Sequence, residues 1–408
     1  MKLKGFVTAA AIAGGITAIA IGMAGPAAAD PAAVSTIAGA GSDTIQDVMN
    51  QLATDDGGNL VGSWDAFKPG TTPPVVHDDI TPKSTTACTN VTRPNGSGEG
   101  VGALRRSLSG STKVGSTASV ATGLAPHAIP LGAACFDFAR SSSGPGANAS
   151  TSGLLQYVPF ALDGVTVAVG PASGTDATNI KGSFTEAQLK TLYSVGTPQV
   201  GSDGVTYDPN SADGTTGTAI HLLLPQAGSG TRTFFAGVMG INATTPPAWV
   251  KDTFVPTAGG AAQSVEEHDG TAVQLDHNAL APFSSAQWIS QARGHNDRRH
   301  GAVLETINST NPCLPTTSAC SDTSTLNESF PSDFLREVYN VIPVSATTSG
   351  GSDANLFNVF VSTSSLKRIC SHSTDITNYG FGLLTSAPKG HTCGQVSSDL
   401  KAFAPGVF

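Results

Sequence analysis

The sequence predicts an α/β protein in which strands and helices alternate along the chain. Short apolar or β-branched runs alternate with segments whose apolar residues recur at helical spacing. Three of the helical segments begin directly after a turn rich in Gly, Ser or Thr. The composition agrees, because 39% of the 408 residues are hydrophobic. This share is enough for a core and excludes a wholly disordered chain.

The elements follow from these patterns. The expected strands cover residues 35–38, 135–139, 157–169 (with a turn at 163–164), 219–224, 279–283 and 341–344. The expected helices begin near Ile45, Val101, Leu189 and Phe234, and a further helix covers 334–339. Residues 54–95 are rich in Gly, Pro, Thr and Asp, so this segment is expected to be mostly loop.

Two of these helices carry capping signals at their starts. Asp43 or Thr44 is expected to cap the helix near Ile45, with Gln46 completing a capping box. Thr185 and Gln188 form the same pattern before the helix near Leu189.

The charge balance limits the classes of ligand. Asp and Glu number 30 against 21 Lys and Arg, which gives a net charge of −9. A broad basic surface for duplex nucleic acid is therefore not expected. A small anion site is not excluded, because net charge says nothing about one local site.

Residues 1–29 are typical of an export signal. Two lysines give a positive start, residues 6–23 are apolar, and Ala27 and Ala29 fit a cleavage site after Ala29. A membrane anchor is the alternative, because the apolar run has nearly spanning length, but the cleavage pattern favours export. We therefore expect a secreted or cell-envelope protein without stable membrane insertion after cleavage. No cysteine lies near the cleavage point, so no lipid anchor on cysteine is expected.

The six cysteines are expected to form disulfides, because an even count in an exported chain favours them. A metal site is not expected, since no close CxxC pair occurs. Many pairings are possible, and we predict that neighbours along the chain pair: Cys88–Cys135, Cys313–Cys320 and Cys370–Cys393.

One motif, a Gly-bearing turn directly before a helix, recurs along the sequence and indicates a ligand site. Gly-bearing turns open helices at 41–44, 96–100 and 228–231, and a fourth turn at 140–143 carries Arg and Ser. Helix N-termini offer unpaired N–H groups and about half a positive charge each, and Gly lets a ligand approach closely. Several converging ends would make an anion site without a basic surface. Ordinary helix capping is the alternative for any single turn.

These segments resemble, in motif order over most of the chain, the phosphate-binding proteins of ABC transporters in the type II periplasmic-binding-protein superfamily. The matching segments are GAGSDT at 39–44, GSGEGV at 96–101, DFARSS at 137–142, VPFALDGVTVAV at 158–169 and GSGTR at 228–232. The last is the most specific of the family's motifs, in which Ser, Gly and Thr contact phosphate.

The resemblance implies a two-lobe fold that closes on its ligand in the cleft between the lobes. The lobes would comprise residues 30–160 with 280–408, and 161–279. The implied ligand is inorganic phosphate or a related oxyanion, the implied partner an ABC permease, and the protein a monomer that is not an enzyme and needs no cofactor or metal. From the resemblance and the two adjacent arginines, the expected ligand-binding residues are Ser42, Asp43, Thr44, Ser97, Arg140, Ser141, Ser142, Ser229, Gly230, Thr231 and Arg232.

Two positions depart from the family pattern. The family's acid, which accepts the proton of hydrogen phosphate, falls on Ser142, and its basic residue before GSGT falls on Pro225. We hypothesise that Asp43 supplies the acceptor, and that Arg140 or Arg232 supplies the positive charge.

Other functions stay open at this point. The same fold could bind sulfate, molybdate or a phosphorylated metabolite, or serve as a secreted surface protein without transport. A phosphoesterase built around Ser229 is a further alternative, although no local base is recognisable. The charged segments 266–269 and 293–300 are interpreted as solvated rather than as metal sites.

Overall fold

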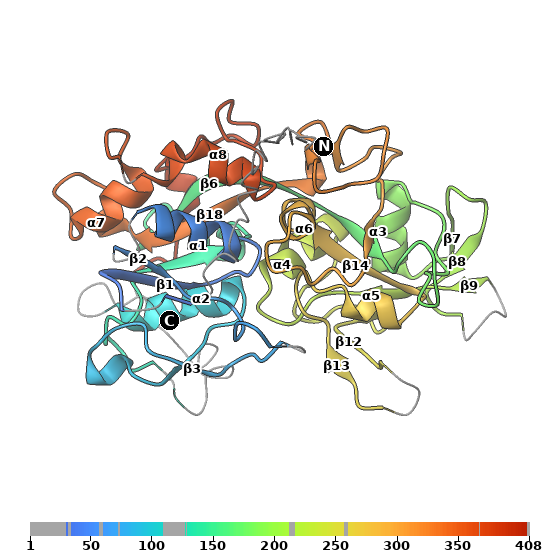
Figure 1. The fold of residues 1–408 in the computed structure, drawn as a ribbon, viewed down its shortest axis with the longest axis horizontal. Helices are drawn as coiled ribbons and strands as arrows, with labels where there is room; N and C mark the ends of the chain where they lie inside the picture. The colour runs from blue at the N-terminus through green and yellow to red at the C-terminus, as the bar shows by residue number, and fades with distance from the viewer. Residues whose placement is uncertain are drawn as a thin grey trace, which may run out of the picture.

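The structure, a computed structural model, describes residues 30–31, 34–56, 60–71, 74–108, 127, 129–211, 217–256, 260–366 and 368–405. The signal segment predicted over residues 1–29 lies outside these ranges. The described chain has the expected α/β fold, with two lobes built around one mixed sheet (Figure 1). In the described ranges, no helix has the length and apolar character required to cross a membrane.

The central sheet runs through both lobes. Its strand order is β11-β10-β14-β6-β18-β5-β1-β2, and β15 and β19 also pair with β6. These strands are β1 (Ile37–Gly41), β2 (Val61–Ser63), β5 (Phe138–Ser141), β6 (Leu155–Val169), β10 (His221–Leu223), β11 (Val250–Lys251), β14 (Ala279–Ser284), β15 (Val303–Leu304), β18 (Leu335–Pro343) and β19 (Lys401–Ala402). Strand β1 is parallel to β2 and β5, and β10 is parallel to β11 and β14, as expected for strands joined by helical crossovers.

Strand β6 connects the lobes. Nine of its first ten residues pair with β18, and residues 165–168 pair with β14. All of its residues are buried, as expected of an apolar strand covered on both faces. The turn predicted at 163–164 is wrong, because the strand continues through it. Asp163 can stay inside the strand because its buried carboxylate accepts hydrogen bonds from Arg336 on β18 and from Ser284 on β14.

The helix predicted over 334–339 is also wrong. Residues 335–339 belong to β18, whose nine residues are all buried and pair with β6 along its length, and Phe334 is the last residue of a 3-10 helix, Ser332–Phe334. A short apolar run fits either period, and here the long partner strand decides the outcome. The register between β18 and β6 shifts once, between Val338 and Tyr339.

The helices divide between the two lobes (Figure 1). The first lobe, blue to cyan with orange to red, carries α1 (Gln46–Asp55), α2 (Ser97–Ser107), α7 (Ala354–Leu356) and α8 (Ser373–Asn378). The second lobe, green to yellow, carries α3 (Glu186–Val195), α4 (Gly230–Met239), α5 (Thr271–Leu275) and α6 (Ser285–Ala292). The capping box predicted at Thr185 and Gln188 is confirmed at the start of α3. The sequence boundaries of the lobes, at 160/161 and 279/280, stay a prediction.

Smaller sheets decorate this frame. They are β3 (Asp79–Ile80) with β4 (Val91–Thr92), β7 (Gln199–Val200) with β8 (Thr206–Asp208) and β9 (Thr218–Ala219), β12 (Thr253–Phe254) with β13 (Gln263–Ser264), and β16 (Cys313–Leu314) with β17 (Thr325–Leu326). Apart from the end of α1, the short strands β2, β3 and β4 and one 3-10 turn at Thr86–Cys88, the described part of 54–95 is irregular, as predicted.

The three predicted disulfides are confirmed. The structure joins Cys88 to Cys135, Cys313 to Cys320 and Cys370 to Cys393. The first of them closes a loop of 47 residues beside α2 and β5. It therefore restrains the part of the first lobe that contributes two of the predicted ligand-binding turns.

Candidate functional site

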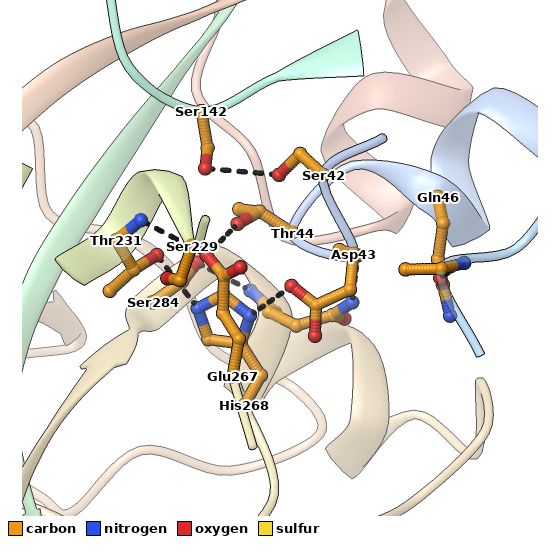
Figure 2. Close-up of polar contacts among 12 residues, drawn as sticks. Ser42, Asp43, Thr44, Gln46, Ser142, Ser229, Thr231, Glu267, His268 and Ser284 are labelled. Carbon is orange, nitrogen blue, oxygen red and sulfur yellow. Dashed lines mark hydrogen bonds and ion pairs between the residues drawn. The ribbon is translucent and has the colours of Figure 1, made fainter. Parts of the chain in front are cut away.

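The predicted Gly/Ser turns meet at one place between the lobes. The Ser42 hydroxyl donates to Ser142 Oγ at 3.0 Å (Figure 2). Ser97 Oγ lies 3.3 Å from the same Ser142 atom. From the second lobe, the Gly228 carbonyl oxygen accepts the Gly98 N–H at 2.9 Å. The N-terminal turns of α2 and α4 and the turn before α1 therefore converge, as the sequence pattern suggested.

Glycine permits this close approach. A Cβ atom on Gly230, the first residue of α4, would lie 2.3 Å from Ser142 Oγ and 2.4 Å from Ser97 Oγ. Across the same contact, Gly96 adopts a φ of +90°, a region that favours glycine. A side chain at either position would hold the lobes apart.

A carboxylate of the protein lies at the N-terminus of α4. Glu267 Oε1 accepts the Thr231 N–H at 3.0 Å and the Thr44 hydroxyl at 3.1 Å (Figure 2). The Glu267 side chain comes from the loop between β13 and α5, and the residue is only 1% exposed. Burial raises the pKa of Glu267. Its second oxygen, Oε2, has no hydrogen-bond partner among the described residues.

His268 connects the two lobes through both ring nitrogens. Nδ1 lies 3.0 Å from Asp43 Oδ1, and Nε2 lies 3.2 Å from Thr231 Oγ1 (Figure 2). All three residues are buried. Burial raises the pKa of Asp43 to about 7, although Arg298 opposes the shift, and burial lowers the pKa of His268 to about 4. The imidazole is therefore neutral near pH 7.

Two arginines that the sequence analysis did not select face these groups. Arg336 on β18 donates to Asp163 Oδ2 from Nε at 3.0 Å and from Nη2 at 2.8 Å, and its Nη2 also donates to Thr231 Oγ1 at 2.9 Å. Arg298 Nη2 lies 3.7 Å from Asp43 Oδ2. These cations give the buried site a positive partner for its carboxylates, or for an anionic ligand.

We refer to this constellation as the polar cluster. Its members are buried side chains from both lobes, in two contacting groups: Ser42, Ser97 and Ser142, and Asp43, Thr44, Thr231, Glu267, His268, Arg298 and Arg336. Six of the ten were selected from the sequence, namely the hydroxyl residues and Asp43.

The two arginines selected from the sequence have other partners. Arg140 donates to the backbone oxygens of Ser42 and Gly41 and to Ser63 Oγ, so it fixes the turn after β1. Burial lowers the pKa of Arg140 to about 10. The guanidinium of Arg232 donates to Asp252 and to two backbone carbonyls. The positive charges that contact the polar cluster are therefore those of Arg298 and Arg336.

The remaining selected residues have local roles. Ser229 is the N-cap of α4, and its hydroxyl accepts the Arg232 N–H at 3.0 Å. This hydroxyl therefore stabilises the first turn of the helix. Ser141 Oγ donates to the Ser143 carbonyl oxygen. Gly230 allows the close contact described above.

The capping role predicted for Asp43 or Thr44 is wrong, because the N-cap of α1 is Ile45 and no side chain caps it. The two side chains bind His268 and Glu267 instead. Gln46 does not complete a capping box, since its Oε1 accepts the Ala66 N–H.

Of the two segments interpreted as solvated, 266–269 is buried or half-buried, whereas 293–300 is mostly exposed or half-buried, as interpreted, apart from Arg298. Glu267 and His268, in segment 266–269, are each 1% exposed. In segment 293–300, the His295 ring stacks on Tyr379 and Arg298 is buried. A run of charged residues, taken alone, predicts a solvent-exposed segment. Burial of such residues is stable only where oppositely charged groups face them, as arginines and carboxylates do here.

A metal ion is a second chemical possibility for part of the cluster. Asp43, Glu267 and His268 each offer a ligand atom, and these atoms lie within 4.8 Å of one another. Carboxylate and imidazole ligands suit several divalent metals. The adjacent guanidinium of Arg298 competes with such an ion for Asp43.

Comparisons with known proteins found similar solved structures and one matching family model. Similar solved structures include an ABC-type phosphate transport receptor from Vibrio cholerae, with 14% identity, a TM-score of 0.41, and coverage of 85% of this chain and 99% of that chain. Another is a putative phosphate ABC transporter substrate-binding protein with bound phosphate from Clostridium perfringens, with 12% identity, a TM-score of 0.44, and coverage of 85% and 98%. A comparison with curated proteins finds no match.

A family model described as a PBP superfamily domain matches residues 26–312. This match spans both lobes and every glycine-rich turn of the polar cluster. It covers well over half of the sequence. The chain therefore belongs to the PBP superfamily.

Proposed function

We propose that this protein is a secreted solute-binding protein that captures phosphate, or a similar tetrahedral oxyanion, for uptake by an ABC transporter. One observation carries the proposal. An oxyanion group of the protein itself, the Glu267 carboxylate, is held by the first-turn amide of α4 and the Thr44 hydroxyl. These are donors that the motif resemblance assigns to phosphate, so the cluster has the chemistry to hold an oxyanion.

The hydrogen-bond donors of the polar cluster can supply the free energy that micromolar binding requires. Hydrogen bonds to a charged group contribute about 1.5–3 kcal/mol each, and micromolar affinity needs about 8 kcal/mol. The hydroxyls of Ser42, Ser97 and Ser142 converge with the Thr231 N–H, and Arg336 adds a cation. In this proposal a ligand oxygen takes the position of Glu267 Oε1, and the lobes close around it.

Hydrogen phosphate carries a proton that sulfate lacks, so a selective site needs an acceptor. We propose that the Asp43 carboxylate supplies it, in place of the family's acid at position 142. Asp43 Oδ2 is buried and has no hydrogen-bond partner among the described residues. The rejection of sulfate would then follow from repulsion between lone pairs.

The same geometry favours a binding role over a phosphoesterase built around Ser229. The Ser229 hydroxyl is oriented by its capping bond to the Arg232 N–H, and no described histidine hydrogen-bonds to it. The permease partner, the monomeric state and release after Ala29 are parts of the same proposal.

Isothermal titration of the refolded, ligand-stripped protein with phosphate, sulfate and molybdate tests the proposal. We expect micromolar or tighter phosphate binding that sulfate does not displace. The S97A/S142A variant should bind at least about a hundredfold more weakly, because two hydroxyl donors are lost. Ser352→Ala is the matched control, since its hydroxyl contacts only exposed Ser345. No heat with any of the three anions would refute the proposal.

A further inference from the structure

We infer that the Glu267 carboxylate is a tethered competitor of the ligand, which phosphate must displace from the polar cluster, so that Glu267 sets the phosphate affinity and excludes solutes that offer only a carboxylate. The inference rests on the proposed function, because it takes the donors around Glu267 as phosphate donors. Glu267 is then a specificity-determining residue that acts by being displaced.

The Glu267 carboxylate bridges the two lobes as a bound anion would. Its Oε1 accepts the Thr231 N–H of α4, in the second lobe, at 3.0 Å and the Thr44 hydroxyl, in the first lobe, at 3.1 Å (Figure 2). The motif resemblance assigns both of these residues to phosphate. An oxygen of phosphate cannot take the two donors while Glu267 Oε1 holds them. Capture of phosphate at this place is therefore an exchange of one oxyanion for another.

The backbone on both sides of Glu267 is anchored, so the carboxylate stays close to these donors. The Glu267 N–H donates to Gln226 Oε1 at 2.9 Å, and the Val265 carbonyl oxygen accepts the Gln226 N–H at 2.8 Å. On the other side, the His268 carbonyl oxygen accepts a hydrogen bond from the Gln291 amide at 2.9 Å. A group tethered within the same molecule competes at an effective concentration of about millimolar or higher. A free carboxylate must exceed that concentration to compete for the same donors.

Glu267 leaves part of the polar cluster unpaired, and this lets a better oxyanion replace it. Glu267 Oε2 is buried and has no hydrogen-bond partner among the described residues. A carboxylate oxygen of Asp43 lies within 4.8 Å of one of Glu267, and two ionised carboxylates cannot donate to each other. Arg336, which donates to the Thr231 side chain, has its Nη1 buried and without a hydrogen-bond partner in the described part of the chain.

Hydrogen phosphate suits these groups better than a carboxylate does. It has four oxygens where a carboxylate has two, and it brings a P–OH proton that Asp43 can accept. A second carboxylate makes no contact that Glu267 does not already make. The apparent affinity of every anion falls with the fraction of molecules in which the donors are free. The tether therefore sets a threshold that phosphate can pass and a simple carboxylate cannot.

Glu267→Ala tests the inference by isothermal titration of the refolded, ligand-stripped protein with phosphate. We expect phosphate affinity to rise at least about tenfold, because one hydrogen bond to a charged group corresponds to at least that factor. The substitution removes Cγ and the carboxylate, a group of the size of acetate. Acetate should therefore compete with phosphate in E267A. It should leave phosphate binding by the wild type unchanged at the same concentration and ionic strength.

Glu267→Asp separates displacement from charge. The aspartate keeps the negative charge, but its side chain is one methylene shorter and cannot reach both Thr231 and Thr44 from the anchored backbone. E267D should therefore also bind phosphate more tightly than the wild type. D65N is the matched control, because Asp65 is a buried carboxylate that contacts Asn50 outside the polar cluster. It should bind phosphate like the wild type.

The outcomes separate the inference from the proposed function. Phosphate affinity in E267A at or below that of the wild type overturns the inference alone, and so does an E267D variant that binds like the wild type, which decides the matter should E267A fail to fold. Acetate that fails to compete in E267A, or that competes equally in the wild type, overturns it as well. If the wild type gives no heat with phosphate but E267A binds it, the tethered carboxylate is supported and the proposed uptake function is refuted. Absence of phosphate binding in the wild type, E267A and E267D overturns both.

Discussion

Replacing Gly230 by alanine should abolish tight oxyanion binding while leaving helix α4 intact. The added Cβ would lie 2.3 Å from Ser142 Oγ and 2.4 Å from Ser97 Oγ, both in the opposite lobe. Ordinary contacts of this kind begin near 3.4 Å. Either the lobes stay about 1 Å further apart, or both serine hydroxyls rotate away. The first lobe and α4 themselves are not strained.

Either rearrangement takes the two serine hydroxyl donors away from the proposed ligand. Each hydroxyl bond to a charged ligand contributes about 1.5–3 kcal/mol, so losing two costs about 3–6 kcal/mol. At about 1.4 kcal/mol per factor of ten, phosphate affinity should fall by about two to four powers of ten. The helix itself should gain stability, because alanine exceeds glycine in helix propensity by about 1 kcal/mol.

Titration calorimetry with phosphate measures the effect, and urea unfolding checks that the variant is folded. Gly237→Ala is the matched control in the same helix, because its added Cβ meets no atom within 4 Å. It should gain the same helix stability and bind phosphate like the wild type. If Gly230→Ala binds phosphate within about threefold of the wild type, the closed contact is not part of the ligand site.

Three further outcomes follow from other contacts. Removing the disulfide in the C88A/C135A variant should lower the free energy of unfolding by about 4 kcal/mol, because the bond closes a loop of 47 residues, and urea unfolding measures this. Asp163→Ala should lower it by about 3–5 kcal/mol, since the substitution leaves buried Arg336 without its carboxylate; R336M/D163A should recover part of the loss if the pair is responsible. Because burial raises the pKa of Asp65 to about 7, its stabilising contribution is complete below pH 3.8 and is lost as pH rises through about 7. Asp65→Asn should therefore gain stability relative to the wild type between those values, and an unchanged difference across this range would contradict the assignment.

The local patterns in the sequence predicted the parts of the site that lie at helix starts. A glycine followed by Ser or Thr and a helical face is a short-range signal, and the turns that it predicted bring Ser42, Ser97 and Thr231 into the polar cluster. It could not say what faces these turns from the other lobe. The partner of Thr44 is 223 residues away in the chain, and the partner of Asp43 is 225 residues away.

The residues that sequence reasoning missed have their partners far away along the chain. Glu267 and His268 lie in a run of four charged or polar letters, which is typical of a solvated turn when read alone. Their burial depends on charge pairing with distant groups. Arg336 was placed in a helix, so its side chain had no predicted partner. Its partner in the structure is Asp163, and this pair can be predicted only if β6 and β18 are known to be adjacent strands.

The error at residues 163–164 has the same cause. Asp-Gly is a strong turn signal, and the pattern alone cannot show that a buried arginine and a serine satisfy the carboxylate. Tertiary contacts here override a local preference. By contrast, the disulfide pairing between chain neighbours needed no long-range information.

The antiparallel ladder of β6 and β18 has a mechanical consequence. Because nine of the first ten residues of β6 pair with β18 and the next four pair with β14, the connection between the lobes is a paired sheet and not a flexible linker. Opening must flex a hydrogen-bonded ribbon, and the register shift between Val338 and Tyr339 is where that ribbon bends most easily. We therefore expect opening of the lobes to be an elastic bending of these paired strands, from which the lobes return to the arrangement seen in the structure.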